Sequence, residues 1–98
     1  MNKKEKDKEM KNVRFLIDRI DDKILPLMVK RSKLVAKALE LKSKKKEIVD
    51  KKRIKQILKK IGSKSNKMKA DPKLIKSIWM DMIQNFIEHE KKEFKKRK

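Results

Sequence analysis

A run of apolar residues at intervals of three or four positions, from Met10 to Leu41, constrains this sequence more than any other feature. This spacing is the a/d heptad repeat of a helix that packs lengthwise against other helices. It predicts one long helix over residues 7–46. Pro26 lies inside this range, but the heptad phase continues past it, so we expect a kinked helix that does not end there. The positions of the repeat are Met10, Val13, Ile17, Ile20, Ile24, Leu27, Arg31, Leu34, Ala38 and Leu41.

The length of this helix predicts that it needs a partner. At ~1.5 Å per residue, 40 residues span roughly 60 Å. A compact domain of about 100 residues has a radius of gyration of only about 13 Å. The apolar stripe must therefore meet another chain unless the helix breaks. A chain of 98 residues has only a modest core, so packing against a second copy would also add stability. We expect a homodimer.

Two further helices follow from the remaining pattern. A polar, Lys-rich segment at Ser43–Val49 holds the first loop, and a second helix is expected over residues 50–61. Gly62 stands where a C′ residue should end that helix, and a polar loop at Ser63–Lys69 would follow it.

Asp71 and Pro72 combine an N-cap residue with a proline at the first helical position, which predicts a third helix over residues 71–95. The predicted fold class is therefore all-α, with three helices in the order long, short, long. They form a single domain over residues 1–98, with basic, frayed termini.

The net charge of +19 predicts attraction to anions without identifying them. No helix-turn-helix, zinc-finger or aromatic stacking pattern accompanies it, so we expect weak nonspecific but no specific nucleic-acid binding. The absence of cysteine excludes disulfides and thiolate metal sites, and neither a metal nor a cofactor is expected. No apolar run reaches the roughly 18–20 residues of a membrane span, and the charged N-terminus lacks a signal-peptide core. We expect a cytoplasmic protein without a membrane partner.

Five charged residues intrude on or beside the apolar faces of the predicted helices. A charge carried into a core is costly unless it is paired. Such residues form either buried ion pairs that fix the packing register or the lining of a cavity for a charged ligand. Four of the five are basic and one is acidic, which favours an anionic ligand. They are Arg14, Arg31, Lys42, Arg53 and Glu90.

The same residues carry a resemblance to the helical, or type II, chorismate mutases. The segment VRFLIDRIDDKILPLMVKRSKLVAKALELK resembles the family's first helix, in which an Arg, an I-D-x-I-D motif, a second Arg and a Lys occur in that order. The segment DPKLIKSIWMDMIQNFIEHE is similar to the third helix, whose Gln or Glu closes the site. The resemblance covers about residues 10–94 and extends to the related isochorismate pyruvate lyases of salicylate synthesis. The matching positions are Arg14, Ile17–Asp21, Arg31, Lys42, Arg53 and Glu90.

The resemblance implies an intertwined homodimer with two sites, each of which takes Arg14 from the partner chain. The substrate would be a small dianion, either chorismate or isochorismate, and the chemistry would need no metal, cofactor or covalent intermediate. Arginine binds carboxylates bidentately, so Arg14 and Arg31 would hold the substrate's carboxylates with help from Arg53. Lys42 and Glu90 would be the catalytic pair that flanks the ether oxygen, where negative charge develops. The remaining residues assigned to substrate binding are Asp50, Leu34, Val35, Ile57, Ile83, Phe86 and Ile87, the last six forming an apolar lining.

Two positions bear on which reaction is catalysed. A neutral Glu90 could donate a hydrogen bond to the ether oxygen, whereas a carboxylate would repel it, so we expect activity to rise toward acidic pH. Ile54 stands where many mutases have a Glu that binds the ring hydroxyl of the substrate, and the lyases also have an apolar residue there. The lyases, however, have Gln at the position of Glu90. We therefore expect a chorismate mutase of aromatic amino-acid biosynthesis, with an isochorismate pyruvate lyase or a non-catalytic nucleic-acid-binding protein as alternatives.

Overall fold

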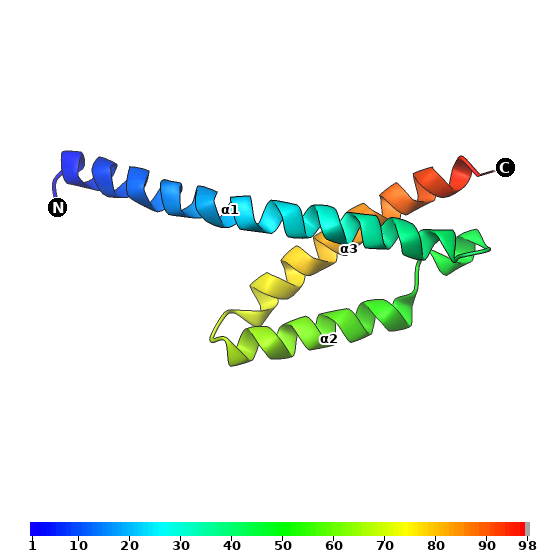
Figure 1. Ribbon diagram of the computed structural model, residues 1–98. Helices are drawn as coiled ribbons and strands as arrows, with labels where there is room; N and C mark the ends of the chain where they lie inside the picture. Colours follow the sequence, from blue (N-terminus) through cyan, green and yellow to red (C-terminus); the bar gives the residue numbers. More distant parts are fainter. Residues whose placement is uncertain (98) are drawn as a thin grey trace. The chain divides into compact units, whose positions relative to one another are not determined.

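The computed structural model describes residues 1–97, which contain three α-helices and no strand (Figure 1). The helices are α1 (Lys3–Glu40), α2 (Lys51–Lys67) and α3 (Pro72–Lys95), and a short 3₁₀ helix, η1 (Lys45–Glu47), lies between the first two. The predicted all-α class and the order long, short, long are confirmed. Lys98, the end of the predicted basic tail, lies outside the described residues.

The chain divides into two compact units, Met1–Leu34 and the residues from Val35 onward. The first unit is the N-terminal part of α1. The second contains the last turns of α1, the loop with η1, and helices α2 and α3. A single domain over residues 1–98 stays a prediction.

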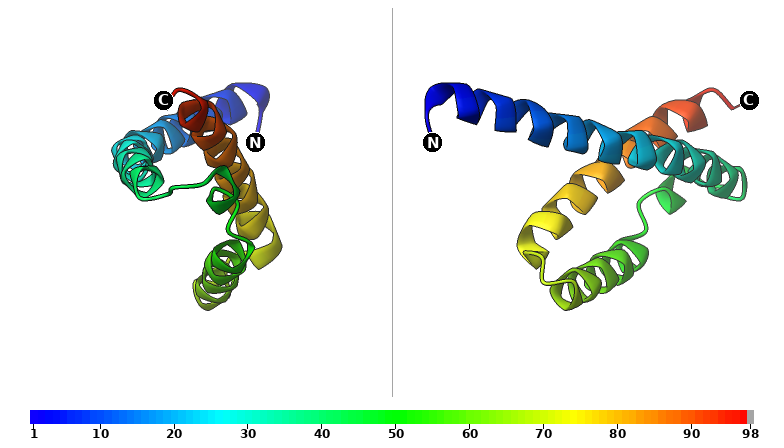
Figure 2. Two further views of the ribbon diagram at one scale, coloured as in Figure 1. Left: turned by 90° about the vertical axis from the view of Figure 1, so that its right-hand side faces the viewer. Right: turned by 60° about the vertical axis from the view of Figure 1, so that its left-hand side comes forward.

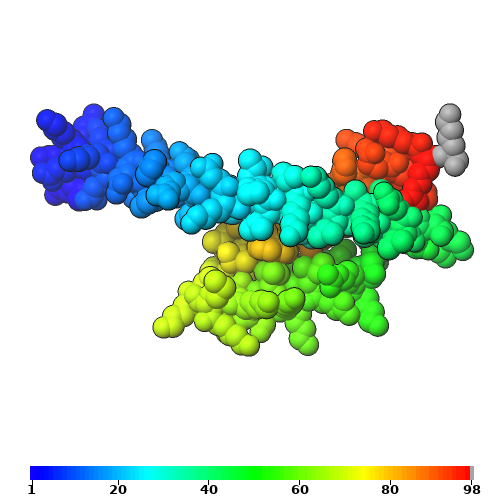
Figure 3. Space-filling view, viewed as in Figure 1, coloured from blue at the N-terminus to red at the C-terminus, as the bar shows by residue number. Residues whose placement is uncertain are grey.

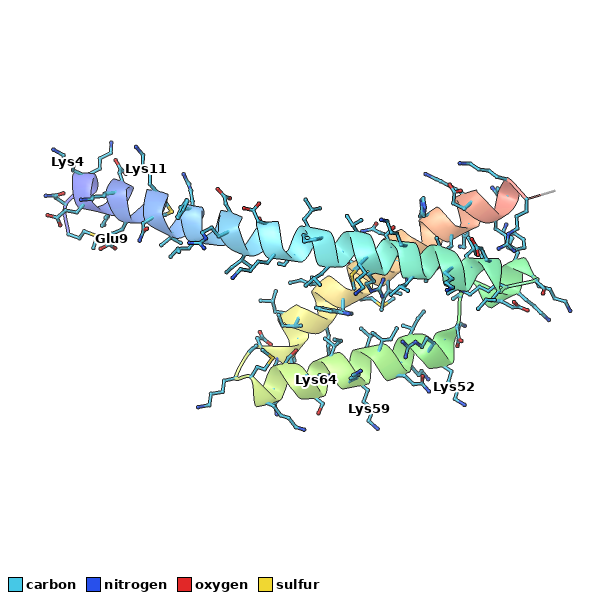
Figure 4. All side chains as sticks on the ribbon, viewed as in Figure 1. Lys4, Glu9, Lys11, Lys52, Lys59 and Lys64 are labelled. Atoms are coloured by element: carbon cyan, nitrogen blue, oxygen red, sulfur yellow. The ribbon has the colours of Figure 1, made fainter. Side chains whose placement is uncertain are left out.

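Helix α1 begins earlier than predicted because Asn2 caps it. The Asn2 side-chain oxygen accepts a hydrogen bond of 2.9 Å from the Glu5 N–H, so the predicted frayed N-terminus is helical from Lys3. The helix continues through Pro26, as predicted. The side chains of Lys4, Glu9 and Lys11 point in different directions around its first turns, as expected of a solvated segment (Figure 4).

Helix α1 ends at Glu40, so the prediction that it reaches residue 46 is wrong. Its last turn tightens, with the Lys42 N–H donating to the Leu39 carbonyl at 3.0 Å. Leu41, predicted as the last apolar position of the stripe, is 83% exposed, whereas Leu39 is buried. The physical reason lies in the following loop, because Ile48 is 4% exposed and must turn back to reach the core.

The start of helix α2 follows the prediction, but its end does not. Gly62 lies inside the helix without a left-handed backbone, and the predicted loop at Ser63–Lys69 is helical as far as Lys67. The left-handed residue is Lys69, with φ of 59°. The Lys69 N–H donates to the Asn66 carbonyl at 3.1 Å and the Ala70 N–H to the Ser65 carbonyl at 3.0 Å, which completes a Schellman motif without glycine.

Helix α3 begins where the sequence predicts. The Asp71 carboxylate accepts a hydrogen bond of 3.0 Å from the Lys73 N–H, and Pro72 occupies the first helical position. From the intervening turn, α3 runs back in roughly the opposite direction to α2 and packs against it (Figure 2). None of the helices within residues 1–97 is long and apolar enough to span a membrane.

The core of the second unit joins all its segments. Its buried members are Leu39 from α1, Ile48 from the loop, and Ile83 and Ile87 from α3. Apolar side chains of α2 and α3 pack around them, which fixes the end of α1 against α3. These surrounding residues are Ile54, Ile57, Leu58, Trp79 and Phe94.

Candidate functional site

Lys42 and Glu90, the two predicted catalytic residues, form a direct ion pair in the second unit. The Lys42 Nζ donates to the Glu90 Oε2 at 2.9 Å. The Lys42 side chain is 24% exposed and the Glu90 side chain only 8%. The pair therefore joins a nearly dry carboxylate to an ammonium that still reaches water.

Glu90 is buried because it occupies an apolar register of α3. Ile83, Ile87 and Glu90 are spaced by four and then three residues, which places them on one face of the helix. All three are buried. A carboxylate on such a face requires a strong partner, and the Lys42 ammonium provides it. The register predicted for Glu90 is confirmed.

The backbone around Lys42 is held on both sides. The Lys42 N–H completes the last turn of α1, and the next amide, of Ser43, donates to the Glu47 carboxylate at 3.0 Å. Arg97 binds the same turn: its Nη1 donates to the Lys42 carbonyl at 2.6 Å, and its Nη2 donates to the Leu39 carbonyl. Lys42 thus extends from an anchored backbone.

Arg97 is the residue of this site that sequence reasoning missed, since the sequence analysis assigns it to a frayed basic tail. That assignment is wrong, because its guanidinium binds the end of α1 and also lies 4.9 Å from the Phe94 ring centre. Cations commonly bind the free carbonyls at helix C-termini. A tail with many basic residues does not indicate which one does so, or on which helix.

Asp50 and Arg53 lie together at the start of α2. The Asp50 carboxylate accepts a hydrogen bond of 2.9 Å from the Arg53 N–H and so caps the helix. The Arg53 side chain is exposed. The structure therefore assigns Asp50 a capping role, and substrate binding by either residue stays a prediction.

The predicted apolar lining is distributed over both units. Ile83 and Ile87 are buried, and Ile57 packs against the core that they form. Val35 and Phe86, also in the second unit, are half-buried.

Three predicted site residues belong to α1 in the first unit. Arg14 and Leu34 are exposed, and Arg31 is half-buried. Their contribution to substrate binding stays a prediction.

The surface of α2 is strongly basic. Residues 51–67 contain no Asp or Glu, and their outward side chains project into solvent (Figure 3). Lys52, Lys59 and Lys64 point away from α3 (Figure 4). Uncompensated charge of this kind raises the local concentration of anions at long range. Within residues 1–97, no group of three or more His, Asp or Glu side chains is arranged to hold a metal ion.

The chain matches a known protein family. The sequence model of the family chorismate mutase type II matches residues 13–91, a range that contains all the predicted site residues from Arg14 to Glu90. No curated protein sequence matches the chain.

Proposed function

Because the chain belongs to the type II chorismate mutase family, we propose that it catalyses the rearrangement of chorismate to prephenate. This reaction is a pericyclic Claisen rearrangement. One ether C–O bond breaks while one C–C bond forms within the same molecule, so no atom or electron is exchanged with the protein. The protein must therefore bind the dianion, hold it in the reactive conformation and stabilise the charge that develops on the ether oxygen.

The contact between Lys42 and Glu90 is the observation that carries this proposal. Its N–O distance of 2.9 Å brings an ammonium and a carboxyl together at the edge of an apolar core. In such surroundings a hydrogen bond to a developing oxyanion is worth more than in water. The Lys42 ammonium has donors beyond the one that meets Glu90, and one of them would donate to the ether oxygen, which Glu90 would flank.

We propose that the protein works as a homodimer. The apolar stripe of α1 within the first unit is open, since Ile17, Ile20 and Ile24 are each about half exposed. Burying a stripe of this length against a second copy would remove a large apolar surface from water. The second copy would also supply Arg14, so sedimentation analysis should give twice the chain mass at micromolar concentration.

Isochorismate pyruvate lyase activity is the second candidate, and Ile54 favours it. Ile54 is half-buried and packs against the core. Many mutases have at this position a Glu whose carboxylate binds the ring hydroxyl of chorismate. The lyase reaction breaks the same ether bond but transfers a hydrogen to the pyruvate that leaves. Lys42 and Glu90 would stabilise the departing oxygen in either reaction.

One experiment separates the two reactions. Purified protein is given chorismate or isochorismate, and prephenate, salicylate and pyruvate are identified by mass spectrometry. Prephenate from chorismate supports the mutase, and salicylate with pyruvate from isochorismate supports the lyase. Lys42→Met should lower the rate of either reaction by roughly a hundredfold or more, whereas Lys52→Met removes an equal charge from the outer face of α2 and should not. If wild-type dimer converts neither substrate, the proposed function is wrong.

A further inference from the structure

The side chain of Arg97 links the last described turn of the chain to the end of α1. Its two terminal nitrogens donate to two different carbonyls, those of Leu39 and Lys42. Carbonyls at the end of a helix have no partners within the helix, and a forked cation can bind two of them at once. The guanidinium is also packed against the Phe94 ring, at 4.9 Å, so its direction is constrained from the α3 side.

These contacts connect Arg97 to the catalytic pair through a single residue. The Lys42 carbonyl accepts from Arg97, and the Lys42 ammonium donates to Glu90. Both Glu90 and Phe94 belong to α3, one turn apart, and Phe94 packs on the core. The Lys42 backbone is thus tied to the same helix that carries its carboxylate partner.

We propose that Arg97 is a positioning residue, which holds the Lys42 backbone so that the ammonium meets Glu90 and the reacting oxygen. The proposal rests on the proposed function for its catalytic consequence. Lys42 lies beyond the end of α1, where no helical hydrogen bond fixes its carbonyl. Without Arg97, Lys42 would be held only by its own N–H and by the loop, and its long side chain would sample more positions.

The neighbouring Lys96 offers a matched control. Its ammonium donates to the Glu93 carboxylate on α3 at 3.0 Å and is 72% exposed. Lys96→Gln therefore removes the same formal charge from the adjacent position without touching α1. If Arg97 acted only through its charge, replacing Arg97 and replacing Lys96 by neutral residues would reduce the activity equally.

The kinetic test uses the full chain and the substrate that the wild type converts. Arg97→Met keeps an unbranched stem over Phe94 but removes the donors, and we expect kcat to fall by roughly tenfold to a hundredfold, with a smaller change in KM. Arg97→Lys restores the charge but cannot bind both carbonyls in the same way, so it should recover activity only in part. Lys96→Gln should retain the wild-type kcat.

A double-variant cycle tests whether Arg97 acts through Lys42. Once Lys42→Met has removed the ammonium, Arg97→Met should lower the residual rate no further, because its effect has already been lost. If Arg97→Met lowers the residual rate of Lys42→Met by the same factor as that of the wild type, the proposal is overturned. An unchanged kcat in Arg97→Met overturns it as well.

A spectroscopic measurement keeps the inference testable even if neither substrate is converted. The ¹³C resonance of the Glu90 carboxyl carbon, assigned with Glu90→Gln, reports the contact with Lys42. In Arg97→Met it should shift toward its position in Lys42→Met, while Lys96→Gln should leave it in place. An unmoved resonance in Arg97→Met overturns the positioning role, whereas a shifted resonance without turnover rejects the proposed function alone.

Discussion

Replacing Lys42 with Met would leave the Glu90 carboxylate buried without its ammonium partner. Breaking a fully buried pair by removing one member costs about 3–5 kcal/mol. The Lys42 side chain is 24% exposed, so water already reaches the site and can move toward the carboxylate. We therefore expect Lys42→Met to lower the free energy of unfolding by about 2–3 kcal/mol at neutral pH.

Replacing Glu90, the other member of the pair, should lower the free energy of unfolding by less. Glu90→Gln keeps the shape of the side chain, and the Lys42 ammonium that loses its partner can turn toward solvent along its flexible stem. We expect a loss of about 1 kcal/mol. The double variant Lys42→Met, Glu90→Leu removes both charges together and should unfold within about 1 kcal/mol of the wild type.

Urea unfolding, followed by far-UV circular dichroism at one fixed protein concentration, measures these differences. With a slope of about 1–2 kcal/mol per molar urea, Lys42→Met should lower the midpoint by roughly 1–3 M. Lys52→Met is the surface control and should stay within about 0.5 kcal/mol of the wild type. If Glu90→Gln destabilises the protein as much as Lys42→Met does, the unequal burial of the two groups does not govern the cost.

The same variants separate stability from activity. Lys42→Met and the double variant should both lose activity, by roughly a hundredfold to a thousandfold, because the donor at the ether oxygen is gone. The double variant should nevertheless remain stable. A stable and active double variant would show that the pair is a packing feature and has no catalytic role.

Two further outcomes are expected. Gly62→Ala should stabilise the protein by about 0.5–1 kcal/mol in thermal unfolding, since Gly62 lies inside α2 and the flexible Lys76 side chain, 2.9 Å from the new Cβ, can shift; a loss of stability would show that Lys76 cannot move aside. The hydrogen bond and charge of Lys96 lower the pKa of the Glu93 carboxyl, so their contact should persist until the pH falls through that lowered pKa. An NMR titration should show the shift, and Lys96→Gln should reverse it.

Local signals in the sequence predict the helices and several of their ends. The heptad stripe predicts α1 because its periodicity requires no knowledge of distant residues, and Asp71 with Pro72 predicts the start of α3 for the same reason. Glu90 is predicted at a buried position because it interrupts an apolar face. Each of these inferences depends on neighbours within one or two turns.

The failures occur where distant contacts decide the structure. Gly62 is the only glycine and favours a helix end, yet α2 continues for five more residues to Lys67, and the left-handed residue is Lys69. The end of α1 is set by two residues distant from it in the sequence. Ile48 lies in the loop that follows α1, and Arg97 follows the end of α3. The apolar periodicity of α1 therefore cannot predict the contacts that these two residues make with its end.

The burial of Ile48 has a consequence for the motions of the loop between α1 and α2. Any local opening of residues 41–50 must withdraw this side chain from the core, at a cost of about 1.5–3 kcal/mol before other contacts are counted. The loop should therefore exchange its amide hydrogens together with the core and not as an independent mobile segment. Lys42 would then leave the vicinity of Glu90 only in rare, cooperative excursions that also expose Leu39 and Ile87.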